Sequence, residues 1–149
     1  MNPTRAHTIL TRLVLASGAA GVLATGAVHL QQYAANQFST VPTIGTLFLL
    51  NFIASTVVGL GLLLSLGRLR APLAERVRAL LAVAGIGIAA CSLIGLWISE
   101  TSSLFGFSDH GYRPAIVAAI VAEAVAVVAL STYLALVGVD RRVARPQPG

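Results

Sequence analysis

The sequence has no lysine, a single cysteine and only five acidic residues among its 149 residues. One cysteine excludes an intrachain disulfide bond and any Cys-x-x-Cys redox or zinc motif. Charged residues make up 10% of the chain and hydrophobic residues 56%, a composition too apolar for a soluble domain of this length. No established enzyme motif is present, so the sequence predicts no reaction and favours a non-enzymatic role.

Four long apolar stretches divide the chain, at about 9–30, 43–66, 78–99 and 114–138. A helix needs about 20 apolar residues, at ~1.5 Å rise each, to cross a bilayer. The sequence therefore predicts an all-α membrane protein with four transmembrane helices in an antiparallel up-down bundle, followed by a basic tail over 140–149. The first stretch follows a basic start, as in a signal peptide, but its length favours a retained helix.

The positions of the arginines predict the topology. Nine of the ten lie near the N-terminus, in the 67–78 connection or in the C-terminal tail, and the tenth is Arg113. Because positive charge stays on the cytoplasmic side, both termini and the 67–78 connection are expected in the cytoplasm. The 31–43 and 99–113 connections are expected outside. Arginines that flank apolar spans indicate membrane topology, and nucleic acid is not a predicted partner.

The two halves of the sequence share one spacing. Pro42 and Asn51 are nine residues apart, as are Pro114 and Glu123, and the two pairs are offset by 72 residues (114 − 42 and 123 − 51). One hypothesis is that the chain contains two repeated hairpins related by an axis along the membrane normal. The alternative is four unrelated helices of similar length, since proline is common in a first helical turn.

Glu123 is the candidate site residue that lies deepest in the predicted membrane, roughly 13 Å along the helix from Pro114. An ionisable group at that depth is costly and is a functional-site hypothesis by default. Two interpretations are open. Glu123 is either a neutral acid that bonds Asn51 to stabilise helix association, or part of a ligand, proton or partner site. Cys91 is expected at the same level, beside small residues at 18–21 that leave room for a ligand.

A second group of candidate residues lies near the predicted outer face. His29 ends the first helix, and Glu100 follows the third, whose dipole disfavours an anion there. The sequence predicts that Arg113 pairs with Glu100 or Asp109, with His29 close by. His110 completes the group of expected ligand- or partner-binding residues. Their spacing matches no established metal motif, so no metal site is predicted.

The 103–114 segment, SLFGFSDHGYRP, joins the third and fourth predicted helices. Gly106 and Gly111 allow tight turns. The segment is therefore expected to fold as a compact, aromatic-rich cap over the mouth of the bundle.

Three short motifs carry a resemblance to a known group of proteins. They are His-Leu at 29–30, PTIGTLFLLN at 42–51 and LFGF at 104–107. In these motifs the chain resembles uncharacterised four-helix integral membrane proteins of high-GC Gram-positive bacteria. The resemblance implies a location in the bacterial plasma membrane and no particular activity.

Two classes of function are consistent with these observations. The first is a non-catalytic accessory or assembly subunit of a larger membrane complex, with a polar site that opens to the outer face. Its expected partners are the lipid bilayer and other membrane subunits or a second copy of the chain. The alternative is a site for a lipid, quinone, haem or proton-coupled solute, lined by Glu123, Asn51 and His29. Haem b usually takes two axial ligands, and only His29 is near a span, so no particular cofactor is predicted.

Overall fold

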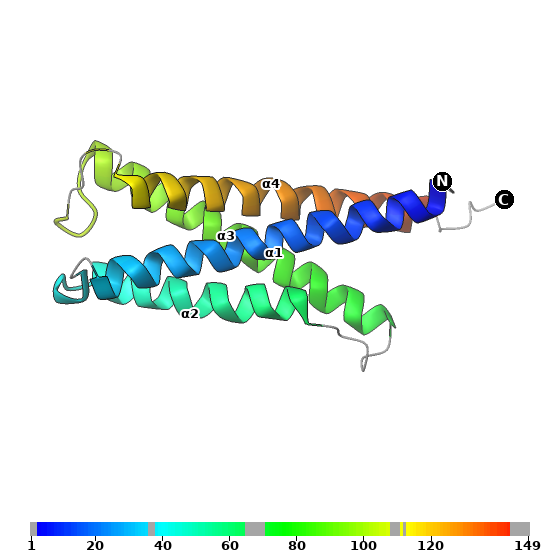
Figure 1. Ribbon diagram of the computed structural model, residues 1–149, viewed down its shortest axis with the longest axis horizontal. Helices are drawn as coiled ribbons and strands as arrows, with labels where there is room; N and C mark the ends of the chain where they lie inside the picture. The colour runs from blue at the N-terminus through cyan, green and yellow to red at the C-terminus, as the bar shows by residue number, and fades with distance from the viewer. Residues whose placement is uncertain (1–2, 36–37, 65–70, 108–110, 112, 144–149) are drawn as a thin grey trace.

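The computed structural model describes residues 3–35, 38–64, 71–107, 111 and 113–143 (Figure 1). Four long α-helices and one short 3-10 helix follow one another along the chain: α1 (Pro3–Ala35), η1 (Phe38–Thr40), α2 (Ile44–Leu63), α3 (Ala71–Thr101) and α4 (Pro114–Val143). Each α-helix is long and apolar enough to cross a membrane. Neighbouring α-helices run in opposite directions and pack against one another. The prediction of an all-α, four-helix membrane fold is confirmed.

Three helices extend beyond the predicted spans. The first runs over Pro3–Ala35 rather than 9–30, and the third over Ala71–Thr101 rather than 78–99. The fourth, Pro114–Val143, continues past 138 into the start of the predicted tail. Hydropathy locates the apolar part of a helix, whereas alanine, leucine, arginine and glutamate continue to favour helix outside it. Pro72 is compatible with the early start of α3, because a proline in the first turn removes no intrahelical hydrogen bond.

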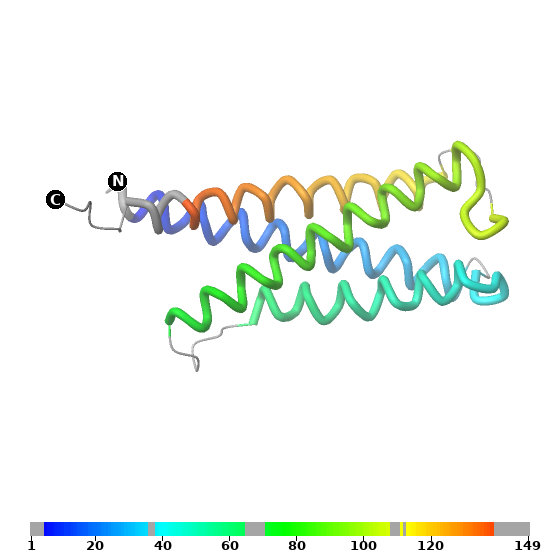
Figure 2. The backbone as a smooth tube through the Cα atoms, turned by 180° about the vertical axis from the view of Figure 1, so that it is seen from behind, coloured from blue at the N-terminus to red at the C-terminus, as the bar shows by residue number. Residues whose placement is uncertain are grey.

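The helices are arranged around α1, which packs closely against both α2 and α4. Figure 2 shows α3 running diagonally across the bundle, from the end of α2 to the start of α4. α1 begins and α4 ends at one end of the bundle, and α2 ends and α3 begins toward the same end (Figure 1). We call this end the terminal end, and the half of the bundle next to it the terminal half; the other half is the loop half. The opposite end, which carries η1 and residues 102–107, is the loop end.

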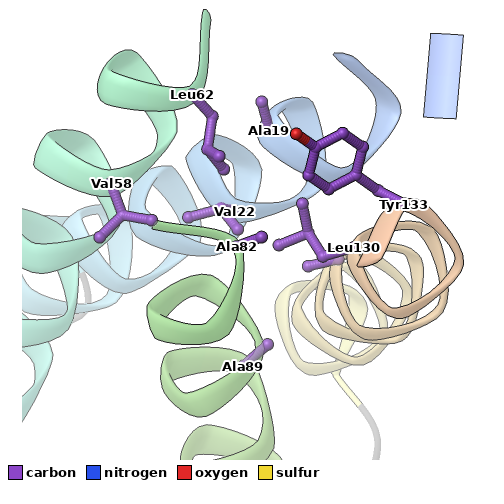
Figure 3. Close-up of a cluster of buried hydrophobic side chains, with 9 residues drawn as sticks. Ala19, Val22, Val58, Leu62, Ala82, Ala89, Leu130 and Tyr133 are labelled. Atoms are coloured by element: carbon purple, nitrogen blue, oxygen red, sulfur yellow. The ribbon is translucent and has the colours of Figure 1, made fainter. Parts of the chain in front are cut away.

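The buried apolar core lies mainly in the terminal half of the bundle, and all four α-helices contribute to it (Figure 3). Its nine members are mostly small or β-branched: Ala19, Val22, Val58, Leu62, Ala82, Ala89, Ala126, Leu130 and Tyr133. Leu130 is the largest side chain that is fully buried. Small residues that pack in this way let the backbones of membrane helices approach closely.

Gly18 and Gly21 of α1 face α4, and neither lines the cavity of about 560 Å³ in the other half of the bundle. A Cβ atom added to Gly18 would lie 2.5 Å from Leu130 Cδ2. One added to Gly21 would lie 2.8 Å from the Ala126 backbone nitrogen and 2.9 Å from the Ala122 carbonyl oxygen. Leu130 of α4 fills the space beside Gly18, whereas Ala20 and Gly21 border a shallow groove against α4. That the small residues at 18–21 leave room for a ligand stays a prediction.

Candidate functional site

A cavity of about 560 Å³ lies in the loop half of the bundle. Its walls come from all four α-helices, from η1 and from the residues that follow α3. Four of the six predicted site residues line it: His29, Asn51, Arg113 and Glu123. Glu100 is not among the lining residues, and His110 lies outside the described residues. Most of the wall is apolar with a few polar groups, which is the usual composition of a small-molecule site.

Aromatic rings connect the elements at the loop end of the cavity. His29 and Phe48 meet edge to face with ring centroids 5.1 Å apart. Phe48 packs against Phe38 of η1 at 5.1 Å. Phe38 in turn meets Phe107 edge to face at 5.4 Å. This row of rings links α1 and α2 to the connection between α3 and α4.

The Leu104–Phe107 segment forms a tight two-residue turn. The backbone N–H of Leu104 donates to the Phe107 carbonyl at 2.8 Å, and the N–H of Phe107 donates back to the Leu104 carbonyl at 2.9 Å. Phe105 and Gly106 have φ angles of 52° and 78°, the two positive values of a type I′ turn. Leu104, Phe105 and Phe107 all line the cavity. The LFGF part of the predicted cap thus lies beside the cavity, whereas residues 108–110 and 112 of that segment lie outside the described residues.

Glu123 is the most deeply buried ionisable side chain in the cavity wall, with 1% of its surface exposed. Neither carboxyl oxygen has a hydrogen-bond partner among the described residues. Asn51 is engaged elsewhere, because its Oδ1 accepts a hydrogen bond of 3.0 Å from the Ser55 hydroxyl. The interpretation in which Glu123 bonds Asn51 to join two helices is therefore not supported.

An unpaired buried carboxyl group has a cost in stability. A buried polar group without a hydrogen bond costs about 1–3 kcal/mol, and more if it is charged. Its buried neighbours along α4, Ala122 and Ala126, are apolar. Glu123 is therefore the strongest candidate for a binding group in this chain.

His29 is buried and is held at both ring nitrogens. Its Nδ1 lies 2.9 Å from the Thr25 carbonyl oxygen. A carbonyl only accepts, so Nδ1 carries a proton and the neutral ring accepts at Nε2. The Ser92 hydroxyl, 3.1 Å from Nε2, is then the donor. Ser92 also lies close enough to interact with the Glu123 carboxyl group, although not in the geometry of a full hydrogen bond. It therefore lies between the two predicted site residues.

Ser92 is a site residue that the sequence reasoning missed. Depth along the helix pointed to Cys91 instead. Cys91 lines the cavity, but its side chain is exposed. Ser92 continues a face of small residues, Ala82, Gly85 and Ala89, spaced by three or four positions and buried in α3. That spacing marks the inward side of a helix and would have identified Ser92.

The predicted ion pair near the loop end stays a prediction. Arg113 lines the cavity. Glu100 has a buried Oε1 that lacks a hydrogen-bond partner, and Asp109 lies outside the described residues. The expected contact between His29 and Glu100 is not among the hydrogen bonds of His29, which go to Thr25 and Ser92. Within the part of the chain that the structure describes, no three His, Cys, Asp or Glu residues group closely enough to hold a metal ion.

The site as a whole can hold a mostly apolar molecule and hydrogen-bond its polar part. Glu123 offers acceptors, and Asn51, whose oxygen is held by Ser55, offers its NH₂ group. Because fold alone does not specify function, these groups matter more than the bundle that carries them. Comparisons with protein-family models, with curated proteins and with solved structures find no match for this chain.

Proposed function

We propose that this chain is a non-enzymatic membrane protein that binds a small, largely apolar molecule inside its helical bundle. The polar part of the molecule is held at Glu123, with Asn51 beside it and His29 fixed close by. This is the small-ligand function that the sequence left as its alternative.

One observation carries the proposal. Glu123 is 1% exposed and lines a cavity of about 560 Å³, and among the described residues neither of its carboxyl oxygens has a hydrogen-bond partner. Cavities of ~300–1,000 Å³ hold small molecules and cofactors in other proteins. An intramembrane carboxyl group is expected to serve a ligand or an ion pathway.

The test is to identify what the protein carries out of the membrane. The wild-type chain is extracted with its surrounding lipid in polymer-bounded nanodiscs, and its small molecules are identified by mass spectrometry. Glu123→Leu is purified in parallel. We expect at least one molecule to be about tenfold or more abundant in the wild type than in Glu123→Leu. A tenfold decrease in affinity is what the removal of one strong hydrogen bond is expected to cause.

Ala124→Leu is the matched control. Ala124 is the next residue of α4 and is exposed, so the variant adds the same side chain to the same helix outside the cavity. It is expected to retain the bound molecule. Identical small-molecule content in the wild type and in Glu123→Leu would rule the proposal out.

The second candidate function is an accessory or assembly subunit of a larger membrane complex. A shallow groove between α1 and α4 favours it, because its walls are mostly small side chains, including Ser17, Ala20, Ala24 and Ala118. Small residues allow a transmembrane helix of another subunit to approach closely. Ala20→Leu would fill the groove without reaching the cavity. A native complex that is lost in Ala20→Leu but kept in Glu123→Leu would support this function.

The proposed location is the bacterial plasma membrane with both termini in the cytoplasm. The distribution of arginines supports this orientation. The arrangement of the helices is compatible with it, because α1 begins and α4 ends at the same end of the bundle (Figure 1). The loop end, with the turn at Leu104–Phe107, would then face outward.

A further inference from the structure

Aromatic and apolar side chains lie across the loop end of the cavity. Phe38 and Phe107 approach each other from η1 and from the turn after α3, with their ring centroids 5.4 Å apart. Phe48 packs against Phe38. Leu104 and Phe107 are joined by two backbone hydrogen bonds, one from each N–H to the other's carbonyl oxygen. These rings narrow the approach to Glu123 from that end, where Phe105 and Arg113 line the cavity and are exposed.

The side of the cavity between α2 and α3 is different. The two helices meet toward the terminal end, where a Cβ atom added to Gly61 would lie 3.0 Å from Leu81 Cδ1. They diverge toward the loop end (Figure 2). Four residues of these helices line the cavity and are also exposed: Leu47, Leu50, Cys91 and Ile94. We call these four residues the α2–α3 opening.

In a bilayer spanned by the four helices, the α2–α3 opening would face the hydrocarbon layer. Its residues lie within the two spans Ile44–Leu63 and Ala71–Thr101. Leu50 and Ile94 are 55% and 56% exposed although they border a cavity. A hydrocarbon chain can pass such an opening at little cost, whereas a polar molecule would lose its hydration there.

We propose that the ligand is a bilayer-resident amphiphile that passes through the α2–α3 opening and donates a hydrogen bond from its head group to Glu123. This inference rests on the proposed function and adds the chemical class of the ligand and its route. The hydrocarbon tail lies along the apolar wall and extends between α2 and α3 into the lipid.

The hydrogen-bonding groups around Glu123 define the head group. An ionised carboxylate only accepts hydrogen bonds. Ser92 uses its hydroxyl proton for His29 Nε2, so it has none to donate to Glu123. A ligand can supply the donor that Ser92 does not, and an ammonium or a hydroxyl group would serve. An ammonium group would also neutralise the buried charge, which is the usual condition for burying a carboxylate.

The experiment uses photoactivatable probes with the full-length protein in nanodiscs of phosphatidylcholine and phosphatidylglycerol. The probes are hexadecylamine and hexadecanol, each with a diazirine in the tail, and a short, water-soluble butylamine diazirine. The unlabelled long-chain compounds and methyl hexadecanoate, which has the tail but no donor, serve as competitors. Labelled peptides are located by mass spectrometry.

Labelling by at least one long-chain probe is expected at the cavity residues, and donor-bearing compounds should displace it while methyl hexadecanoate does not. Glu123→Leu should lower the labelling by about tenfold or more, as expected for one strong hydrogen bond. Ala124→Leu should leave it unchanged. Whether the amine or the alcohol competes better shows whether charge pairing contributes.

The route is tested by filling the opening. Leu50→Trp combined with Ile94→Trp should slow labelling severalfold. The matched control is Val57→Trp with Val83→Trp, two exposed positions on the same helices away from the cavity. Labelling by the short probe alone, or equal rates in both double variants, would overturn the lateral route. If no long-chain probe labels the cavity while a native molecule still depends on Glu123, the inferred ligand class is wrong and the proposed function stands.

Discussion

The terminal and loop halves of the bundle are built from similar apolar residues but are packed differently. In the terminal half, the helices approach closely through glycine, and a Cβ atom added to Gly18 would lie 2.5 Å from Leu130 Cδ2 of α4. In the loop half, α2 and α3 diverge around a cavity whose wall contains the unpaired carboxyl group of Glu123. Tight packing in one half can hold the bundle together, so that the other half can keep an open, polar site at a cost in stability.

The contrast predicts opposite responses to substitution. Changes in the terminal half should destabilise the bundle, because the residues there are complementary in shape. Removing the polar group from the loop half should stabilise the ligand-free protein and abolish binding. A trade of stability for function of this kind is common at binding sites.

The largest expected difference between the two ends is in their accessibility from outside the cell, where one end should react with a thiol reagent and the other should not. In a Cys91→Ser background, Ser39→Cys at the loop end should react with an impermeant thiol reagent added to sealed cells. Ala71→Cys at the terminal end should not react. Both positions are exposed, whereas Ala74 in the same turn region is buried and unsuitable. Labelling of Ala71→Cys from outside would reverse the proposed orientation.

Leu130→Ala should have the largest effect on stability, because Leu130 is fully buried at the centre of the core. The expected loss is about 2–5 kcal/mol in the free energy of unfolding, the range measured for buried leucines. Ile98→Ala provides the comparison in the loop half. Ile98 is half-buried and borders an existing cavity, so its loss should be less than ~2 kcal/mol. Equal losses in reversible detergent unfolding would remove the distinction between the halves.

Gly21→Ala tests the close approach of α1 and α4. The added methyl group would meet the backbone of Ala122 and Ala126, which cannot move aside without shifting a helix. The expected loss is about 1–3 kcal/mol. Gly87→Ala is the control, because nothing lies within 4 Å of a Cβ atom there, and it should be neutral or stabilising by up to ~1 kcal/mol. A neutral Gly21→Ala would contradict the packing described above.

Glu123→Leu should stabilise the ligand-free protein by about 1–3 kcal/mol, because it removes an unpaired buried polar group. Glu123→Gln should have a smaller effect, since the amide is also unpaired at that position. If Glu123→Leu instead lowers the unfolding temperature, the carboxyl group has a structural partner and the functional interpretation is weakened.

Phe105→Asn should give the smallest effect on stability. Phe105 has a φ angle of 52° and an exposed side chain, and asparagine before glycine is the favoured pair in a type I′ turn. The variant should be neutral or more stable by up to ~1 kcal/mol. Because Phe105 lines the cavity, ligand affinity should fall although stability does not. A large loss of stability would show that the ring is needed for folding.

Most of the fold was predictable from the sequence, because long apolar stretches flanked by arginine have few alternatives in a membrane protein. The depth of Glu123 also singled out a residue that the structure places in the cavity wall. The partners of that residue were less accessible. Whether Asn51 reaches Glu123 or Ser55 depends on helix rotation and crossing angle, which spacing along one helix does not specify.

The small residues of α1 illustrate the same limit. Glycine on a membrane helix is compatible with close packing and with a ligand cavity, and the sequence alone favours neither. The structure shows that Gly18 and Gly21 contact α4. The divergence of α3 from α2, rather than any glycine, leaves the cavity open. This divergence depends on contacts between segments far apart in the chain.

The most direct test of the central claim is an experimental structure of the wild-type chain in native lipid, at a resolution that shows bound lipids and side-chain contacts. The expected result is non-protein density in the cavity, within hydrogen-bond distance of the Glu123 carboxyl group and continuous with density between Leu50 and Ile94. The contradicting result is a cavity filled by the protein's own side chains, with Glu123 hydrogen-bonded to Asn51 or Ser92.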